Sequence, residues 1–294
     1  MKYVKLFEQF ILESGNSVED AQPFRQDQVK PTIDWVTKNI FPEIGLVGID
    51  DDAAVLGSAG KKADDQTSGD IDLAVSADKI AGHLGSSLDQ SLFALDAKLK
   101  SMGYQTKLAI GFNQVSIGVP IAGDSKLGVG QLDFMLSTDL EWSRFIYHSP
   151  NFREAESKYK GAYRNILLMA AVGKSFYEVT KTTEAGETAE YKAYVVRLNQ
   201  GITEVRKSFE GKKGLVKTAK LLRDYDNLIT REPQGVVDLL FNGSFTPSDI
   251  DTYEKLYGLL NSNSFKYPKA LNDIMLEFKK KLDENGLPLP EGLN

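Results

Sequence analysis

The sequence contains no cysteine, and this absence removes several kinds of chemistry at once. Without thiols there are no disulfide bonds, no thiolate zinc sites and no cysteine nucleophile, and a cytoplasmic location is compatible with the composition. Histidine is almost as scarce, because only His83 and His148 occur, and neither lies in a pattern typical of catalysis. Carboxylates, hydroxyls and amines are therefore the groups that remain to carry chemistry.

Long hydrophobic runs are missing as well. No apolar stretch approaches the roughly 18 residues that a membrane-spanning helix needs, so we expect no membrane contact. The nucleophile elbow of serine hydrolases is also absent. The 294 residues, of which 41% are hydrophobic and 26% charged, are typical of a globular protein with one large or two modest domains.

The most informative pattern that is present combines a Gly-Ser turn with three acids. Asp70 and Asp72 are separated by Ile71, and Asp133 stands later between two apolar residues. Side chains alternate along a strand, so the first two carboxylates project from the same face. Neighbouring carboxylates repel each other unless a cation lies between them. The pattern therefore indicates a site for a hard divalent cation such as Mg²⁺.

Gly57-Ser58 precedes this pair and is suited to a phosphate group. Glycine lets backbone amides approach an anion closely, and the serine hydroxyl can donate a hydrogen bond. Lys61 follows the turn and adds a positive charge. A phosphate cradle beside metal-binding carboxylates is the minimum apparatus for phosphoryl or nucleotidyl transfer.

Together these residues resemble the signature of the DNA polymerase beta superfamily of nucleotidyltransferases, over roughly residues 53 to 136. The resemblance implies transfer of a nucleoside monophosphate from an NTP such as ATP to a hydroxyl, with pyrophosphate release and two Mg²⁺ or Mn²⁺ ions. It implies that Asp70 and Asp72 hold both metals, and that Asp133 binds the one that activates the hydroxyl. The implied nucleotide contacts are Gly57, Ser58, Lys61, Ser68 and Gly69.

The expected fold class is α/β (α+β), with a mixed sheet flanked by helices and a mainly helical C-terminal region that contains a β-hairpin. We expect a helical leader and linker over residues 1–44, the core over 45–150, and an acceptor-binding region over 151–294. Expected core strands are 53–57, 70–75, 104–110, 114–120 and 128–136, with helices 31–40 and 78–102 and a polar linker over 14–28. Beyond the core we expect a hairpin of 175–180 and 190–198, and helices 154–171, 215–230, 247–260 and 268–284.

Two basic groups in the second half are candidates for binding polyanions. Lys160 and Arg164 are four residues apart in the expected helix 154–171, where they can face the nucleotide or the acceptor. A second cluster would contact RNA or another nucleic acid, and if residues 215–230 are helical, Lys213, Lys217 and Lys220 would fall on one stripe of it. Either group can instead be an ordinary solvated helix face. The second cluster comprises Arg206, Lys207, Lys213, Lys217, Lys220 and Arg223.

Residues 1–13 are similar to the short leaders of proteins packaged into the heads of large tailed bacteriophages, with Ile11-Leu12-Glu13 at the position of a cleavage site. That similarity implies a virion or host-cytoplasm location. The other interpretation is an amphipathic helix that packs on the core. Three functions stay open on the sequence, namely an RNA or tRNA end-modifying enzyme, an enzyme that nucleotidylates a protein or small molecule, and an inactive virion or binding component.

Overall fold

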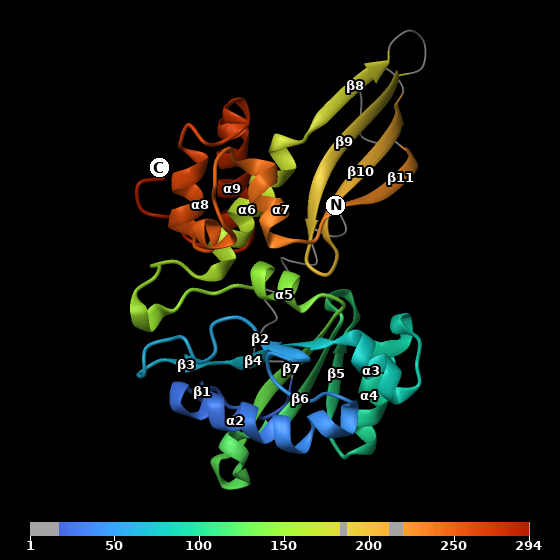
Figure 1. Cartoon of the computed structure of the whole chain (residues 1–294), viewed down its shortest axis with the longest axis vertical. Helices are drawn as coiled ribbons and strands as arrows, with labels where there is room; N and C mark the ends of the chain where they lie inside the picture. The colour runs from blue at the N-terminus through green and yellow to red at the C-terminus, as the bar shows by residue number, and fades with distance from the viewer. Residues whose placement is uncertain (1–17, 183–186, 212–219, 294) are drawn as a thin grey trace. The chain divides into compact units, whose positions relative to one another are not determined.

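The structure, a computed structural model, describes residues 18–182, 187–211 and 220–293. The chain divides into two compact units, Met1–Ala162 and Tyr163–Asn294 (Figure 1). The leader, the expected turn around Gly186, and both Lys213 and Lys217 lie outside the described residues. None of the described helices is long and apolar enough to cross a membrane.

The first unit is built on a five-stranded mixed sheet, as the sequence predicts. Its strand order is β2-β4-β7-β6-β5. The central pair β4 and β7 is parallel, and the other neighbouring strands are antiparallel. Strands β1 (Phe24–Arg25) and β3 (Thr67–Ser68) form a separate two-stranded antiparallel ribbon. The five strands are β2 (Ala53–Val55), β4 (Asp70–Ser76), β5 (Thr106–Ala109), β6 (Gln114–Pro120) and β7 (Val129–Ser137).

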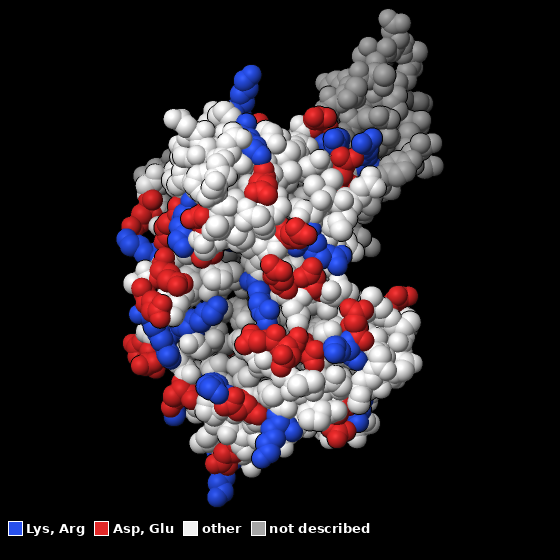
Figure 2. Space-filling view, in the orientation of Figure 1, with Lys and Arg blue, Asp and Glu red and all other residues white. Residues whose placement is uncertain are grey.

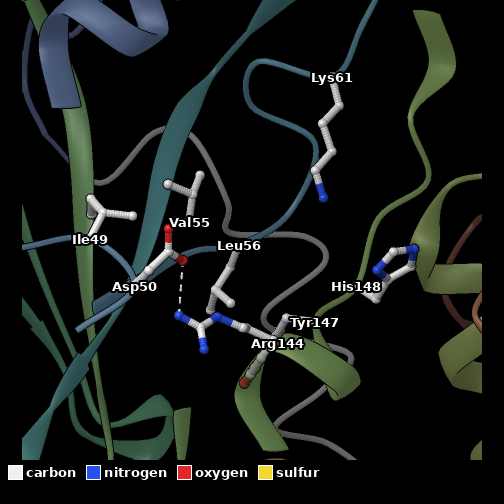
Figure 3. Close-up of a pocket in the computed structure, with 8 residues that line it drawn as sticks. All are labelled: Ile49, Asp50, Val55, Leu56, Lys61, Arg144, Tyr147 and His148. Carbon is white, nitrogen blue, oxygen red and sulfur yellow. Dashed lines mark hydrogen bonds and ion pairs between the residues drawn. The ribbon is translucent and has the colours of Figure 1, made fainter. Parts of the chain in front are cut away.

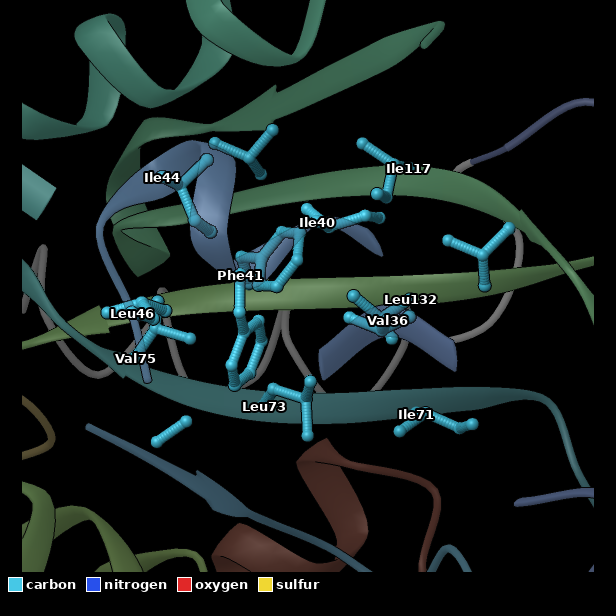
Figure 4. Close-up of a cluster of buried hydrophobic side chains, with 14 of the residues drawn as sticks. Val36, Ile40, Phe41, Ile44, Leu46, Ile71, Leu73, Val75, Ile117 and Leu132 are labelled. Carbon is cyan, nitrogen blue, oxygen red and sulfur yellow. The ribbon is translucent and has the colours of Figure 1, made fainter. Parts of the chain in front are cut away.

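One face of this sheet forms the hydrophobic core (Figure 4). Ile71, Leu73 and Val75 of β4 alternate toward it and are fully buried. They pack with the helices α2 (Gln26–Asn39), α3 (Ala77–Leu84) and α4 (Ser91–Ser101). The short helix α5 (Leu140–Ile146) contacts β2 and β4 from the opposite face (Figure 1). Because alternation turns every second residue away from the core, the polar residues of β4 and β7 share that opposite face.

Several expected helix boundaries need correction. Helix α2 begins at Gln26 instead of residue 31, so the expected linker is too long and Pro31 lies inside the helix. The expected helix 78–102 is divided, because Gly85 ends α3 in a left-handed conformation with φ of 65°. Helix α6 (Gly161–Ser175) begins after Lys160, and not at residue 154.

The second unit joins a helical cluster to a four-stranded antiparallel sheet of order β11-β10-β9-β8. Its helices α6, α7 (Pro233–Leu240), α8 (Tyr253–Leu260) and α9 (Leu271–Glu284) bury residues such as Leu167, Leu256 and Phe278. The strands are β8 (Glu178–Thr182), β9 (Glu187–Arg197), β10 (Gly201–Gly211) and β11 (Lys220–Thr230).

The expected hairpin corresponds to β8 and β9, and two further strands extend it. The expected helix 215–230 is wrong over its described part, because residues 220–230 form β11 and pair with β10. Lys220 of the basic cluster is therefore the first residue of a strand, and not part of the helix on which the stripe was expected. In a strand, consecutive side chains point to opposite faces, which changes the geometry on which the RNA contact was predicted.

Candidate metal and nucleotide site

The structure brings the three predicted acids together on the polar face of the first unit's sheet. Asp72 on β4 is the direct register partner of Asp133 on β7, and Asp70 lies two residues earlier on the same face of β4. One carboxylate oxygen from each acid lies within 4.8 Å of the others. The parallel pairing of β4 with β7 creates this arrangement, because it aligns two strands that are far apart in the sequence.

The cluster is strained electrostatically. Burial raises the pKa of Asp72 well above its usual value, and the charges of Asp70 and Asp133 raise it further. Burial also raises the pKa of Asp133, to about 7, despite hydrogen bonds from neighbouring side chains. For Asp70, burial raises the pKa and the charge of Lys62 partly opposes that shift. Carboxylates held so close together favour protons or a cation between them.

Two oxygens of the cluster support a ligand there. Asp70 Oδ2 and Asp72 Oδ1 are buried and have no hydrogen-bond partner within the described part of the chain. Buried carboxylate oxygens without partners carry a large desolvation cost. Hard oxygen ligands of this kind are the donors that Mg²⁺ and Mn²⁺ prefer.

Asp133 is oriented by residues that the sequence pattern did not single out. Gln131 Nε2 donates to both of its carboxylate oxygens, at 3.0 and 3.2 Å. Ser116, the register partner of Asp133 on β6, and Gln114 also hydrogen-bond to it. Gln131 could have been predicted from the sequence, because it lies two residues before Asp133 on the same strand and therefore shares its face. The two residues on β6 depend on a pairing that the sequence does not reveal.

Gly57 lies directly against the acids. It has a φ of 64°, and a Cβ added there would lie 3.1 Å from Asp72 Oδ2. Its amide donates to the carbonyl of Tyr147 at 3.3 Å. The following turn is held by a hydrogen bond from the Lys61 amide to the Ser58 carbonyl. Only a glycine fits this position without strain, so the turn can stay close to Asp72.

The turn also offers backbone donors. The amides of Ser58, Ala59 and Gly60 donate to no atom of the described residues. Successive amides of this kind, next to a glycine with positive φ, form a concave site for an anion. The phosphate contact of the turn stays a prediction, to which donors of this kind are suited.

The basic side chains near the turn face different ways. Lys61 Nζ donates to the Ser149 carbonyl at 3.0 Å, and burial lowers its pKa. It faces a cavity of about 350 Å³ that the three acids do not line (Figure 3). Lys62 interacts with one of the acids: burial and then the charge of Lys160 lower its pKa, while the charge of Asp70 raises it. The cavity is lined by Ile49, Asp50, Val55, Leu56, Lys61, Arg144, Tyr147 and His148.

Three predicted nucleotide contacts have other surroundings. Ser68 is 3% exposed and accepts a hydrogen bond from Gln26 Nε2 at 3.1 Å, so its hydroxyl is part of the packing. Gly69 is exposed in the bend between β3 and β4. Arg164 is fully buried in the second unit, where its guanidinium donates to the Ile250 carbonyl and to Asn165 Oδ1. Its expected contact with the nucleotide stays a prediction, one that burial of the guanidinium does not favour. Lys160 is exposed.

The expected nucleic-acid cluster is also changed. Arg206 on β10 donates to Glu204 Oε1 at 2.6 Å, and Lys192 on β9 lies 3.1 Å from the same carboxylate. Glu204 thus neutralises part of the positive charge on this sheet. On the visible face, acidic and basic side chains of the first unit are interspersed and form no broad basic surface (Figure 2).

Comparisons with known proteins add little. No family model matches the chain, and no curated protein matches it. A solved structure of Leishmania infantum polymerase beta in a ternary gap complex is similar with a TM-score of 0.34 and 12% identity. The alignment covers 99% of this chain and 80% of that one. A TM-score this low carries no weight for fold or activity, so function has to be inferred from the carboxylate cluster itself.

Proposed function

We propose that this chain is a metal-dependent nucleotidyltransferase, which moves a nucleoside monophosphate from an NTP to a hydroxyl acceptor and releases pyrophosphate. One observation carries the proposal. Three carboxylates from two adjacent parallel strands converge within 4.8 Å beside a glycine turn whose next three amides donate to no atom of the described residues. A metal-binding cluster and an anion-binding turn in direct contact are the two parts that transfer from a triphosphate requires.

The residues fit divalent cations. Asp70, Asp72 and Asp133 would hold Mg²⁺ or Mn²⁺, and the two buried oxygens without partners are the observation that supports this fit. When bound, such ions neutralise the carboxylates, stabilise charge on the transferred phosphoryl group and activate the attacking hydroxyl.

The other residues would bind the triphosphate or hold the Asp133 carboxylate in place. Gly57 keeps the turn close to Asp72, and the amides of residues 58–60, which donate to no atom of the described residues, would donate to the triphosphate. Lys62 and Lys160 contribute positive charge on the side of Asp70, where the triphosphate would otherwise meet only acids. Gln131 and Ser116 fix the Asp133 carboxylate, so that no reorganisation is needed when substrate binds.

The test is to incubate the protein with each of the four NTPs, labelled on the α-phosphate, with Mg²⁺ and with or without total RNA. We expect labelled product that requires the metal, and its identity separates RNA acceptors from protein or small molecules. Asp72→Asn should reduce transfer more than about hundredfold, since loss of one charge-stabilising group typically costs 10²–10³ in rate. Asp89→Asn, at an exposed acid of the same unit, is the matched control. A protein that fails to bind Mg²⁺–NTP would contradict the proposal and indicate an inactive binding component.

A further inference from the structure

The cavity beside the turn has no part in the proposed function (Figure 3). Its volume of about 350 Å³ lies at the lower end of the range of about 300–1,000 Å³ that is typical of small-molecule sites. All of its lining residues belong to the first unit. The three acids do not line it, and neither do residues 58–60, whose amides we propose for the triphosphate. The cavity is thus separate from both parts of the proposed site.

Lys61 extends into this cavity from the turn (Figure 3). Its amine donates to the Ser149 carbonyl at 3.0 Å and forms no ion pair among the described residues. Burial lowers the pKa of Lys61, and the charge of Glu156 only partly opposes that shift. A half-buried ammonium group that is bonded to a neutral carbonyl gains stability when an anion lies beside it.

Arg144 lines the cavity from α5 and has donors that no described residue uses. Its Nη2 donates to Asp50 Oδ1 at 3.0 Å and to the Ala53 carbonyl at 3.5 Å, whereas Nε and Nη1 donate to no atom of the described residues. The side chain of Asp50 is 85% exposed, so water and salt screen its charge. Lys61 and Arg144 therefore give the cavity a surplus of positive charge, which suits a phosphate or carboxylate group.

The rest of the cavity wall is mainly apolar. Ile49, Val55 and Leu56 contribute aliphatic side chains to it. Small-molecule sites typically combine such a wall with a few polar groups that fix the orientation of the ligand. A ligand that fits this lining therefore carries an apolar body as well as its anionic group.

The cavity wall is joined to the metal site through the backbone. The Leu56 amide donates to the Asp72 carbonyl at 2.9 Å, and the Gly57 amide donates to the Tyr147 carbonyl at 3.3 Å. Leu56 and Tyr147 both line the cavity. A ligand in the cavity would therefore contact residues that hold the turn beside Asp72.

We propose that this cavity is a second ligand site, which binds a small organic anion through Lys61 and Arg144. The anionic group is a phosphate ester or a carboxylate, and the apolar body of the ligand packs on the aliphatic wall. This ligand is a different molecule from the NTP of the proposed function. Its binding needs neither the metal nor the nucleotide, so the site can be tested without them.

The experiment measures by calorimetry the binding of phenyl phosphate, benzoate and phenol, in EDTA and without NTP. We expect at least one of the two anions to bind, and phenol, which carries no charge, to bind at least about tenfold more weakly. The anion that binds more tightly shows whether the site prefers phosphate esters or carboxylates. Absence of binding by both anions, or equal binding of phenol, would overturn the inference.

Variants locate the bound anion. Arg144→Met and Lys61→Met should each weaken its binding about tenfold, because a hydrogen bond between charged groups is lost, whereas Lys61→Arg should retain it. Arg153→Met is the matched control. Arg153 pairs with Asp64 at 2.9 Å and its side chain is 41% exposed, as is that of Arg144, but it does not line the cavity. With all variants shown to be folded by their melting temperatures, equal binding by Arg144→Met and Arg153→Met would overturn the inference.

Competition tests whether the site is separate from the nucleotide. An excess of Mg²⁺–NTP should leave the affinity for the anion unchanged. Displacement of the anion by Mg²⁺–NTP would show that the cavity belongs to the nucleotide site, and would overturn the inference while supporting the proposed function. A protein that binds the anion but not Mg²⁺–NTP would instead contradict the proposed function and support this second site.

Discussion

Asp72 and Asp133 face each other directly across the parallel pair β4 and β7, with no protein cation between them among the described residues. Each carboxylate raises the free energy of ionising the other, in addition to the cost of burial. Arrangements that lower the stability of a protein without its ligand cluster at active sites and ligand-binding sites. The pair therefore links the stability of the first unit to its proposed activity.

We expect Asp133→Asn to stabilise the metal-free protein. The substitution keeps an oxygen that can accept from Gln131 while it removes one of the facing charges. Because one pKa unit corresponds to about 1.36 kcal/mol, the free energy of unfolding at pH 8 should rise by on the order of 1–3 kcal/mol. Chemical denaturation in EDTA measures this change. The variant should also lose the stabilisation that Mn²⁺ gives the wild type, and an unchanged response to Mn²⁺ would remove Asp133 from the metal site.

The pH dependence has a definite sign. The pKa of Asp133 in the folded protein, about 7, is above its unfolded value near 3.8. Its contribution to stability is therefore complete below the unfolded pKa and is lost as the pH rises through about 7. In EDTA, the melting temperature should fall between about pH 5 and pH 7 and level off above that range, and Asp133→Asn should flatten the fall. Mn²⁺ should restore more stability at pH 8 than at pH 6, because its ligands must lose their protons.

The carboxylate site was predictable because its signals are local. Alternation along one strand places Asp70 and Asp72 on one face, and the apolar neighbours of Asp133 mark another buried strand. The same reasoning failed at β11. Residues 220–230 are rich in leucine and basic residues that favour helices, and only pairing with β10 makes them a strand. Such pairing depends on tertiary contacts, which a local pattern does not contain.

Substitution of Gly57 can separate the effect of its close approach to Asp72 from a general loss of protein stability. Gly57→Ala places a methyl group in a left-handed conformation, which costs about 1–2 kcal/mol, and brings it toward Asp72 Oδ2. Gly85→Ala is a matched control, since its φ of 65° is nearly the same and nothing lies within 4 Å of its added Cβ. Both variants should lose similar stability. Only Gly57→Ala should weaken Mn²⁺ binding, measured by calorimetry on folded protein, and equal binding in both would show that the close approach to Asp72 is unimportant.

Lys160 and Arg164 were predicted as a pair, and the structure separates them. The reason is the start of α6 at Gly161, which leaves Lys160 outside the helix and buries Arg164 on its inner side. Because Lys160 precedes the helix, the relation that places residues i and i+4 on one helix face does not apply to this pair. Burial of an arginine is also rare enough that the sequence favours exposure.

Substitution of each residue by methionine should therefore have opposite effects. Arg164→Met leaves the Ile250 carbonyl and Asn165 without their donor, so the free energy of unfolding should fall by about 2–4 kcal/mol. The affinity of this variant for Mg²⁺–NTP, measured on folded protein, should stay within about twofold of the wild type, because the guanidinium is buried and bonded inside the second unit. Lys160→Met should leave stability unchanged and weaken Mg²⁺–NTP binding about two- to fivefold, the range of an exposed charge interaction. A folded Arg164→Met variant with much weaker nucleotide binding would instead place that guanidinium in contact with the nucleotide.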